Sequence, residues 1–411
     1  MNWTPESVRE AAAFGVDVRR WLHRHPELSF QEKQTAEFIA RQLREMGYTP
    51  ETGLGGVHSV KAVLQGGKPG RTVALRADID ALPIQEDTGL PFASEVPGVM
   101  HACGHDMHTA ALLAAARTLK PLAADLAGTV VFIFQPAEEV PPGGARPLVQ
   151  AGILDNPHVD AVFGLHVDPF LPAGWMSFAP GAVNASPDSF DIVIRGKGGH
   201  GAAPHQSIDA AVVAAQAVVA LQSIASRMVN PFEPLVITVG RLQAGTARNV
   251  IAEEARLEGT VRTTSPELRQ QIEGLIDRAV AGVCSTYGAT HTMEYLYGYP
   301  VLVNDAAMTD LARQAAAAAL GPDAVLRAEP GMYGEDFAYY AEARPACFGN
   351  LGVGLPRATQ RYPAHHPKLF VADEEAMPVA VAYYLNLVTR FCAVHATIEK
   401  TIYIRRAPQE A

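Results

Sequence analysis

The segment 100–111, with the sequence MHACGHDMHTAA, carries an unusual density of side chains with lone pairs. Within eight positions it places His101, Cys103, His105, Asp106 and His108. Thiol, imidazole and carboxylate groups form a mixed ligand set that suits a divalent transition metal such as Zn²⁺, Mn²⁺, Co²⁺ or Ni²⁺. The backbone freedom of Gly104 allows Cys103 and His105 to turn toward one point. The segment therefore indicates a metal site, in which His101 and His108 are better suited to supporting or packing roles.

Further metal-ligand residue types follow three apolar segments that have the character of buried strands. The segments 72–79, 128–136 and 159–167 are rich in β-branched and aromatic residues. At or just after their ends stand Asp78, Asp80, Glu138, Glu139, His166 and Asp168. In open α/β sheets, ligands bind beyond the carboxyl ends of the strands. Each residue alone could be a turn, surface or solvated group, but their joint placement favours one metal centre.

The elements that must position these groups alternate between helical and strand patterns. Helical spacing of apolar residues covers 6–27, 33–48 and 108–124, and Asp106 is a plausible N-cap of the third helix. Strands that alternate with helices predict an open, mostly parallel sheet with helices on both faces. The first part of the chain is therefore expected to be an α/β domain.

From about Ser189 the order of elements changes. Strand and helix patterns follow in the order β-α-β-β-α-β, at 189–199, 207–228, 234–243, 254–264, 266–288 and 290–300. This order is typical of a ferredoxin-like α+β unit. Helical and strand patterns then resume at 305–321 and 345–354. We expect a catalytic domain formed by 1–187 and 303–411, with residues 188–302 inserted as a lid or dimerisation domain.

Composition narrows the class of protein. The chain of 411 residues exceeds the usual size of one core, and its 48% apolar and 18% charged residues indicate a globular protein. A net charge of -10 argues against nucleic-acid binding. The amino end shows no export signal and we found no apolar run of about 20 residues, so we expect a soluble cytoplasmic protein without a membrane partner. Of the four cysteines, Cys284, Cys347 and Cys392 have apolar neighbours and are expected to be buried and reduced.

Seven motifs together resemble those of a known enzyme family. They are MHACGHDMHTAALL, FQPAEE, GLHV, GKGGHGAAPH, GTARNVIAEEARLEGTVR, GEDFAYY and HHPKLF. In this order they resemble the metal-dependent amidohydrolases that include hippurate hydrolases, N-acyl-amino-acid aminoacylases, related carboxypeptidases and plant auxin-conjugate hydrolases. The resemblance extends over residues 19–387.

The resemblance implies two divalent metal ions per chain and hydrolysis of the amide bond of N-acyl amino acids. The metal ligands it implies are Cys103 as a bridge, His105, Glu139, His166 and His365, with Glu138 as general base. His366 adjoins His365 and is the alternative ligand. The wider superfamily of co-catalytic zinc exopeptidases has His-x-Asp where this chain has Asp78-Ile79-Asp80, and aspartate where it has Cys103. These departures leave Zn, Mn, Co and Ni open.

Two cations about 3.5 to 4 Å apart can lower the pKa of a shared water from 15.7 to about 7. Glu138 and Glu139 would point opposite ways in an extended segment, so that one binds metal while the other transfers a proton. Asp80 would orient a ligand.

On the inserted domain, the resemblance places His200 and Asn249 at the substrate, where they would stabilise the oxyanion. Arg248 is a candidate partner for the substrate carboxylate. Closure of the insert would exclude water. Glu335 and Asp336, in GEDF, receive no role.

Three other hypotheses compete with this one. A dipeptidase or metallocarboxypeptidase could use the same site. A hydrolase could use Cys103 as a nucleophile beside a histidine, without metal. A binding protein could retain the scaffold without activity, although all five expected ligand positions hold suitable residues. We also expect a homodimer or higher homo-oligomer, because exposed edges of such an insert often pair.

Overall fold

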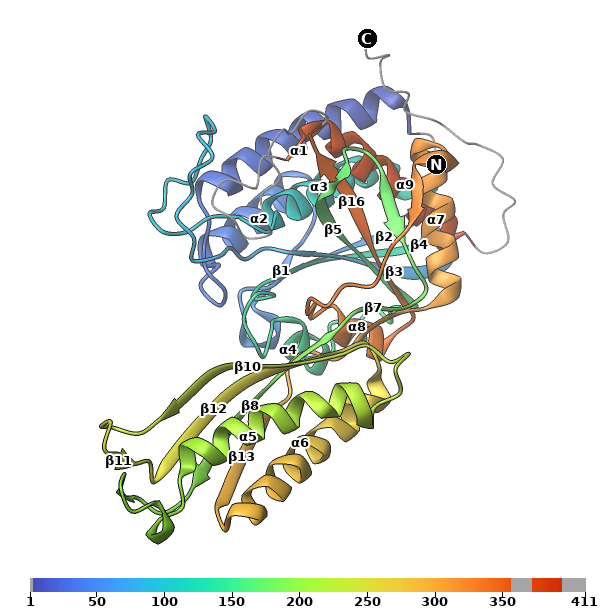
Figure 1. The fold of residues 1–411 in the computed structure, drawn as a ribbon. Coiled ribbons are helices and arrows are strands. Elements are labelled where there is room, and N and C mark those ends of the chain that lie inside the picture. Colours follow the sequence, from blue (N-terminus) through green and yellow to red (C-terminus); the bar gives the residue numbers. More distant parts are fainter. Residues whose placement is uncertain (1–2, 356–371, 394–411) are drawn as a thin grey trace, which may run out of the picture. The chain divides into compact units, whose positions relative to one another are not determined.

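The computed structural model describes residues 3–355 and 372–393, so His365 and His366 lie outside the described residues. The chain divides into two compact units (Figure 1). Unit 1 comprises Met1–Gly181, Val303–Glu329 and Asp336–Ala411, and unit 2 comprises Ala182–Leu302 and Pro330–Glu335. The first two boundaries between the units fall within β7 (Gly181–Asn184) and β14 (Leu302–Asn304).

Unit 1 is built on an eight-stranded sheet with the order β1-β2-β4-β3-β5-β16-β6-β15. The strands are β1 (Glu51–Thr52), β2 (Val60–Gln65), β3 (Lys68–Asp78), β4 (Ala127–Gln135), β5 (Ala161–Pro172), β6 (Met176–Phe178), β15 (Val325–Arg327) and β16 (Ala346–Gly354). The central strands β4, β3, β5 and β16 run parallel. Antiparallel partners flank them, since β2 pairs with β4 and β6 pairs with β16. The expected mostly parallel α/β sheet is therefore confirmed.

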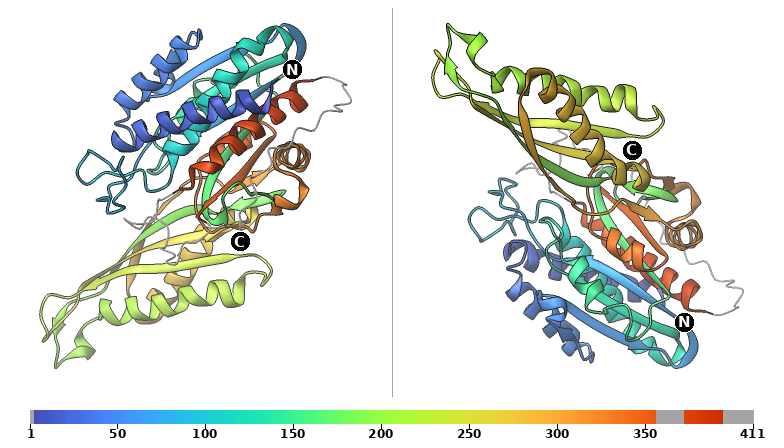
Figure 2. Two further views of the ribbon diagram at one scale, coloured as in Figure 1. Left: turned by 90° about the horizontal axis from the view of Figure 1, so that it is seen from above. Right: turned by 90° about the horizontal axis from the view of Figure 1, so that it is seen from below.

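The helices of unit 1 cover both faces of this sheet. They are α1 (Pro5–Arg24), α2 (Lys33–Glu45), α3 (His105–Leu119), α4 (Ala145–Gln150), α7 (Ala306–Leu320), α8 (Ala338–Ala343) and α9 (Met377–Cys392). Figure 2 shows α1 and α9 lying side by side. Val73, Leu75 and Ala77 of β3 belong to the core shared with α3 and α9. Because successive strand residues face opposite ways, Arg76 points to the other face, where its guanidinium lies 6.0 Å from the ring centroid of Phe337.

The start of α3 differs from the expectation in one respect. The residue before the helix is Gly104, with φ 88°, and the helix begins at His105. Asp106 is therefore not the N-cap. It lies in the first turn, where its fully buried carboxylate accepts a hydrogen bond from Arg19 Nε at 3.2 Å and lies 2.9 Å from His23 Nδ1. The buried guanidinium of Arg19 attracts the carboxylate of Asp106 into the interior.

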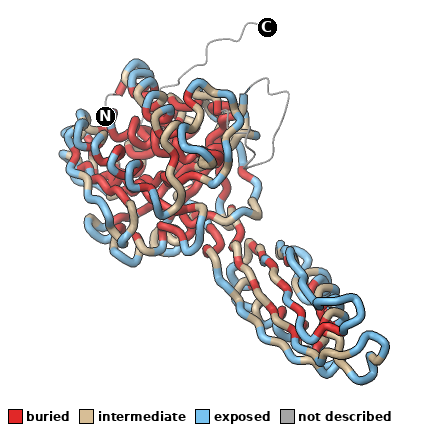
Figure 3. Tube along the Cα trace, turned by 90° about the vertical axis from the view of Figure 1, so that its left-hand side faces the viewer, coloured by how far each residue is buried: buried red, intermediate tan, exposed pale blue. Residues whose placement is uncertain are grey.

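Unit 2 has the predicted β-α-β-β-α-β order. Its strands are β8 (Ser186–Arg195), β10 (Leu235–Ala244), β12 (Glu254–Thr263) and β13 (Thr290–Leu296), and its helices are α5 (Ala210–Ser223) and α6 (Pro266–Tyr287). The antiparallel sheet has the order β10-β12-β8-β13. A short ribbon pairs β9 (Gly199–His200) with β11 (Val250–Ile251). Figure 3 shows that buried residues gather in the interior of each unit.

One helical stretch of the described chain, Ala210–Met228, is long and apolar enough by length and composition to cross a membrane. This is weak evidence for a membrane span, because core helices of soluble proteins pass the same test. The residues Val213, Ala214, Ala217 and Leu221 are buried and join the core of unit 2. Their helical spacing places one side of α5 against the sheet.

Candidate metal centre

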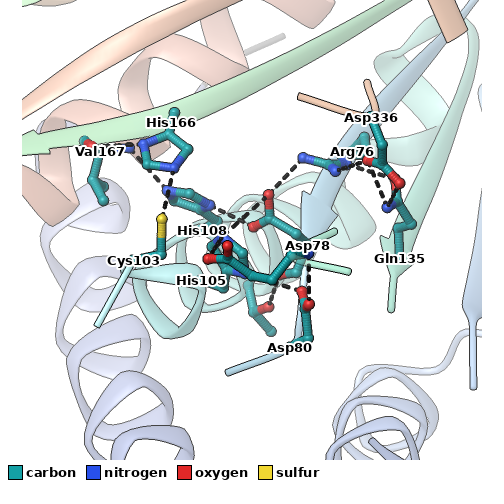
Figure 4. A network of polar contacts seen from close by, with 12 residues as sticks. Arg76, Asp78, Asp80, Cys103, His105, His108, Gln135, His166, Val167 and Asp336 are labelled. Atoms are coloured by element: carbon teal, nitrogen blue, oxygen red, sulfur yellow. Dashed lines mark hydrogen bonds and ion pairs between the residues drawn. The ribbon is translucent and has the colours of Figure 1, made fainter. Parts of the chain in front are cut away.

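Three candidate ligands converge from two separate parts of the sequence. One ligand atom each of Cys103, His105 and His166 lies within 4.8 Å of the other two. Cys103 precedes α3, His105 begins it, and His166 lies in β5 beside it (Figure 4). The Sγ atom of Cys103 is 3.3 Å from Nε2 of His166. This spacing leaves the three groups close enough to share one cation.

A second group of candidate ligands includes the same histidine. One ligand atom each of His105, Glu138 and Glu139 lies within 4.8 Å of the others. The expectation that the two glutamates diverge is therefore wrong. The segment bends after β4 instead of staying extended, and Ala137 has a φ of 56°, in the left-handed region. Both carboxylates consequently reach the neighbourhood of one imidazole.

The donor atoms at this point fit a cation. His105 Nε2 and Glu139 Oε1 are buried and have no hydrogen-bond partner among the described residues. They lie 3.8 Å apart. Leaving such buried polar atoms unsatisfied costs about 1 to 3 kcal/mol each, whereas a bound cation would satisfy both. The thiol and imidazole of Cys103 and His166 add the softer donors that transition metals accept.

Asp80 connects several of these groups. Its Oδ1 lies 3.1 Å from His105 Nδ1, and its Oδ2 accepts hydrogen bonds from Ser29 Oγ at 2.7 Å and from the Glu139 backbone N–H at 3.0 Å. A carboxylate at Nδ1 fixes the ring and leaves the lone pair of Nε2 for a cation. Asp80 thus orients a histidine and anchors the glutamate segment at the same time.

The remaining histidines of the 100–111 segment have other surroundings. His108 Nδ1 lies 2.5 Å from Asp78 Oδ1, and its Nε2 accepts the Val167 N–H at 2.9 Å. Burial lowers the pKa of His108 to about 4, so the ring is neutral. His101 is buried as well, and burial lowers its pKa to about 4. Since both nitrogens of His108 have partners, His108 has no lone pair left for a metal.

Burial also dominates the titration of the acidic groups. It raises the pKa of Glu139 to about 7, against the lowering influence of His105. Burial raises the pKa of the Cys103 thiol well above its usual value, and the charge of Glu139 adds to this effect. A cysteine nucleophile needs surroundings that favour the thiolate. In the site without a cation, burial and the charge of Glu139 favour the thiol over the thiolate. This argues against the cysteine-nucleophile hypothesis.

Unit 2 brings its own candidate residues together. His200 pairs with Val250 across the β9–β11 ribbon, and the Gly201 N–H donates to the Asn249 carbonyl oxygen at 2.9 Å. His200, Arg248 and Asn249 are all exposed. The Nδ1 atom of His200 accepts the Ala202 N–H at 3.1 Å, which leaves its Nε2 directed elsewhere. These three residues form one exposed polar group at the ribbon.

Sequence reasoning missed Glu32, a buried carboxylate beside the site. Its Oε1 accepts the backbone N–H groups of Ala137 at 2.8 Å and Phe30 at 3.0 Å. Both of these residues have positive φ without being glycine. Glu32 therefore stabilises the bend that presents Glu138. No periodic pattern or ligand spacing in the sequence points to it.

Asp168, another candidate from the sequence, accepts the Phe170 N–H at 2.7 Å and does not belong to either ligand group. The cysteines other than Cys103 are buried and free, as expected.

Comparison with known proteins places this geometry in a family. The model of Peptidase family M20/M25/M40 matches residues 74–390. The chain is 44% identical over 376 residues to N-acetylcysteine deacetylase of Bacillus subtilis (strain 168), covering 90% of this chain and 95% of that protein. It is 49% identical over 297 residues to N-acyl-L-amino acid amidohydrolase of Geobacillus stearothermophilus, covering 72% and 80%.

A solved structure agrees with these sequence relatives. The YXEP protein of Bacillus subtilis, described as a dinuclear metal binding peptidase from the M20 family, has a TM-score of 0.80 and 39% identity to this chain. The match covers 93% of this chain and 98% of that one. Because the family model spans most of the sequence and both the relatives and the fold match over most of their length, this chain belongs to Peptidase family M20/M25/M40, a family of metal-dependent hydrolases.

Proposed function

We propose that this protein hydrolyses the amide bond of N-acyl amino acids with water activated at a pair of divalent metal ions. The observation that carries the proposal is that His105 belongs both to a ligand group with Cys103 and His166 and to a ligand group with Glu138 and Glu139. The relatives named N-acetylcysteine deacetylase and N-acyl-L-amino acid amidohydrolase support the substrate class.

In this proposal Cys103, His105, Glu139, His166 and His365 would hold the two cations. When bound, the cations would supply Lewis acidity toward the substrate carbonyl and lower the pKa of a water molecule. Glu138, whose carboxylate reaches the same neighbourhood as that of Glu139, takes the proton from water and delivers it to the leaving amine.

Asp80 holds the His105 ring in the orientation that exposes Nε2. The anchoring of Glu139 through its backbone N–H keeps the adjacent Glu138 in place. A preorganised general base of this kind typically contributes about 10²- to 10⁴-fold in rate.

His200, Arg248 and Asn249, the exposed polar group of unit 2, would contact the substrate in this proposal. His200 and Asn249 would donate hydrogen bonds to the oxyanion, and Arg248 would pair with the substrate carboxylate. We propose that the inserted domain, residues 188–302, acts as a lid and as the dimerisation domain of a cytoplasmic homodimer or higher homo-oligomer. Zinc and manganese are the metals we propose first, with cobalt and nickel as alternatives.

The decisive experiment combines metal analysis with a substrate screen. The purified protein should hold about two divalent ions per chain. It should hydrolyse hippurate or N-acetyl amino acids, lose this activity on chelation and regain it when metal is added. Glu138→Gln should retain the metal but lose at least about 10²-fold in kcat. Full activity in the chelated, metal-free protein would refute the proposal.

A second candidate function is a dipeptidase or carboxypeptidase that uses the same site. The specific observation in its favour is the solved neighbour described as a peptidase. Turnover of an N-acetyl amino acid and of a free dipeptide with the same carboxy-terminal residue separates the two. A higher kcat/KM for the dipeptide would select the second candidate.

A further inference from the structure

The GEDF motif places a carboxylate at a fully buried position in unit 1. Asp336 Oδ1 accepts a hydrogen bond from Arg76 Nη2 at 2.8 Å. Gln135 Nε2 donates to both oxygens of Asp336, at 2.9 and 2.8 Å, and the Ala145 N–H donates to Oδ2 at 2.9 Å. A residue that follows unit 2 in the sequence is thus bound to strands that precede it.

Arg76 links Asp336 to a second buried carboxylate. Its Nη1 donates to Asp78 Oδ2 at 2.6 Å, and its Nε donates to Gln135 Oε1 at 2.8 Å. The side chains of Arg76, Asp78 and Asp336 are all 0% exposed. Removing one partner from a buried charged group leaves the other partner uncompensated. The guanidinium is consequently held in one position by carboxylates on either side (Figure 4).

The hydrogen bonds of His108 have a fixed direction. The Val167 backbone N–H can only donate, so His108 Nε2 is the acceptor in their 2.9 Å contact. In the neutral ring the proton therefore lies on Nδ1, which donates it to Asp78 Oδ1. The position of Asp78, fixed by Arg76, thereby fixes the ring of His108.

The Val167 peptide group also contacts His166, a proposed metal ligand. Its carbonyl oxygen can only accept, and it lies 2.7 Å from His166 Nδ1, so Nδ1 carries the proton of that ring. The lone pair of His166 Nε2 is then directed toward Cys103 Sγ, 3.3 Å away. One peptide group therefore connects His108 on one side with His166 on the other.

We infer that Asp336 is a positioning residue for the metal centre, acting through Arg76, Asp78, His108 and the Val167 peptide to orient His166. The inference rests on the proposed metal centre. Asp336 lies 260 positions after Arg76, so the first and last sequence segments of unit 1 must pack together before this orientation is fixed. This role needs no contact of Asp336 or Arg76 with substrate or metal, although one ligand atom of Asp336 lies within 4.8 Å of one ligand atom of Glu138.

The test measures the affinity of the metal-free, full-length protein for Co²⁺ in wild type, Asp336→Asn, His108→Asn and the double variant. Asp336→Asn keeps the size of the side chain but removes the charge opposite Arg76. His108→Asn keeps a donor near Asp78 but is too short to accept the Val167 N–H. The absorption spectrum of the Co²⁺-loaded protein reports thiolate coordination and ligand geometry independently of activity.

Each single variant should lower the Co²⁺ affinity by about 10- to 100-fold, the usual cost of losing a group that orients a ligand. Because both act on the same chain of contacts, the double variant should bind little more weakly than the weaker single variant. The ligand-field bands should shift in all three. The matched control is Asp188→Asn in unit 2, where the carboxylate is paired with Arg269 at 2.8 Å. It should lower stability while leaving the Co²⁺ affinity within about twofold of wild type.

Single variants that bind Co²⁺ within about twofold of wild type would overturn the inference, as would a double variant that loses the product of both single effects. If Asp336→Asn does not fold, His108→Asn decides, because an unchanged affinity and spectrum there refute the chain of contacts. A wild type without a thiolate-to-cobalt band would overturn the proposed metal centre and this inference with it. If wild type shows the band and the variants have the same affinity and spectrum as wild type, the inference about Asp336 is overturned while the proposed metal centre stands.

Discussion

Replacement of His23 by glutamine is expected to make the stability of unit 1 less dependent on pH above neutrality. His23 is fully buried in α1, with Nδ1 2.9 Å from Asp106 Oδ2 and Nε2 3.2 Å from Glu86 Oε1. Burial by itself lowers the pKa of this histidine, but the charges and hydrogen bonds of Asp106 and Glu86 outweigh it and raise the pKa to about 9. The folded protein therefore holds an imidazolium between two carboxylates.

The magnitude follows from the difference between folded and unfolded states. The pKa of about 9 exceeds the ordinary value of 6.5 by about 2.5 units, and each unit corresponds to about 1.36 kcal/mol, which gives about 3 kcal/mol. Because the folded pKa is raised, this contribution is fully present below pH 6.5 and is lost as the pH rises through 9. The stability advantage of wild type over His23→Gln should accordingly shrink by about 3 kcal/mol across this interval.

The assay is urea unfolding of both proteins at several pH values from 6 to 9.5, in chelator, followed by tryptophan fluorescence. Trp3, Trp21 and Trp175 are the three tryptophans of the chain and all belong to unit 1, so the signal reports that unit. His158→Gln, at an exposed position of unit 1, is the control and should show no comparable change. A wild-type advantage that stays constant with pH, or grows as the pH rises, would refute the reasoning.

Three further changes probe the metal centre. Gly104→Ala should lower the metal affinity and cost more than about 1 kcal/mol of stability, because a φ of 88° is strained for alanine. Chelator competition measures the affinity and urea unfolding measures the stability. Unchanged values of both would contradict the role of this turn. Glu32→Ala should lower kcat, because the Ala137 N–H loses its hydrogen-bond acceptor. Glu32→Gln keeps an acceptor oxygen and should retain most of the wild-type kcat. Equal kcat values in the two variants would argue against the role of Glu32 in supporting the bend. Binding of Zn²⁺ at pH 7 should release about one proton or more, since Cys103 and Glu139, whose pKa values are raised, must ionise. Calorimetry in buffers of different ionisation enthalpy measures that release, and binding without it would show that both groups were ionised beforehand.

The sequence predicts the convergence of the ligands because parallel strands bring their carboxyl ends to one edge of the sheet. It does not predict local geometry that depends on distant partners. The expectation for Glu138 and Glu139 failed because Ala137 adopts positive φ, and its N–H is bound by Glu32, 105 positions earlier. The expected N-cap failed because Asp106 pairs with Arg19, 87 positions away.

The position of Arg76 in the sequence is a signal for a buried ion pair. Arg76 stands inside the apolar segment 72–79, and arginine is almost never fully buried unless it is paired. A buried strand with an arginine in it predicts a carboxylate partner, although not which one. The structure pairs this arginine with Asp78, two positions on, and with Asp336 of the GEDF motif. The position of the arginine was informative, whereas its second partner required the fold.

The dense segment 100–111 is explained by helical geometry as much as by metal binding. Successive residues of a helix are separated by about 100°, so His105 and Asp106 at the start of α3 must face different neighbours. His105 contacts Asp80, and Asp106 contacts Arg19 on α1. His108, one turn after His105, contacts Asp78 instead. A single turn of helix is thus held by three separate charged partners, and the same contacts that fix the turn also fix His105. Many of the lone pairs in this segment therefore anchor the ligands instead of binding the metal.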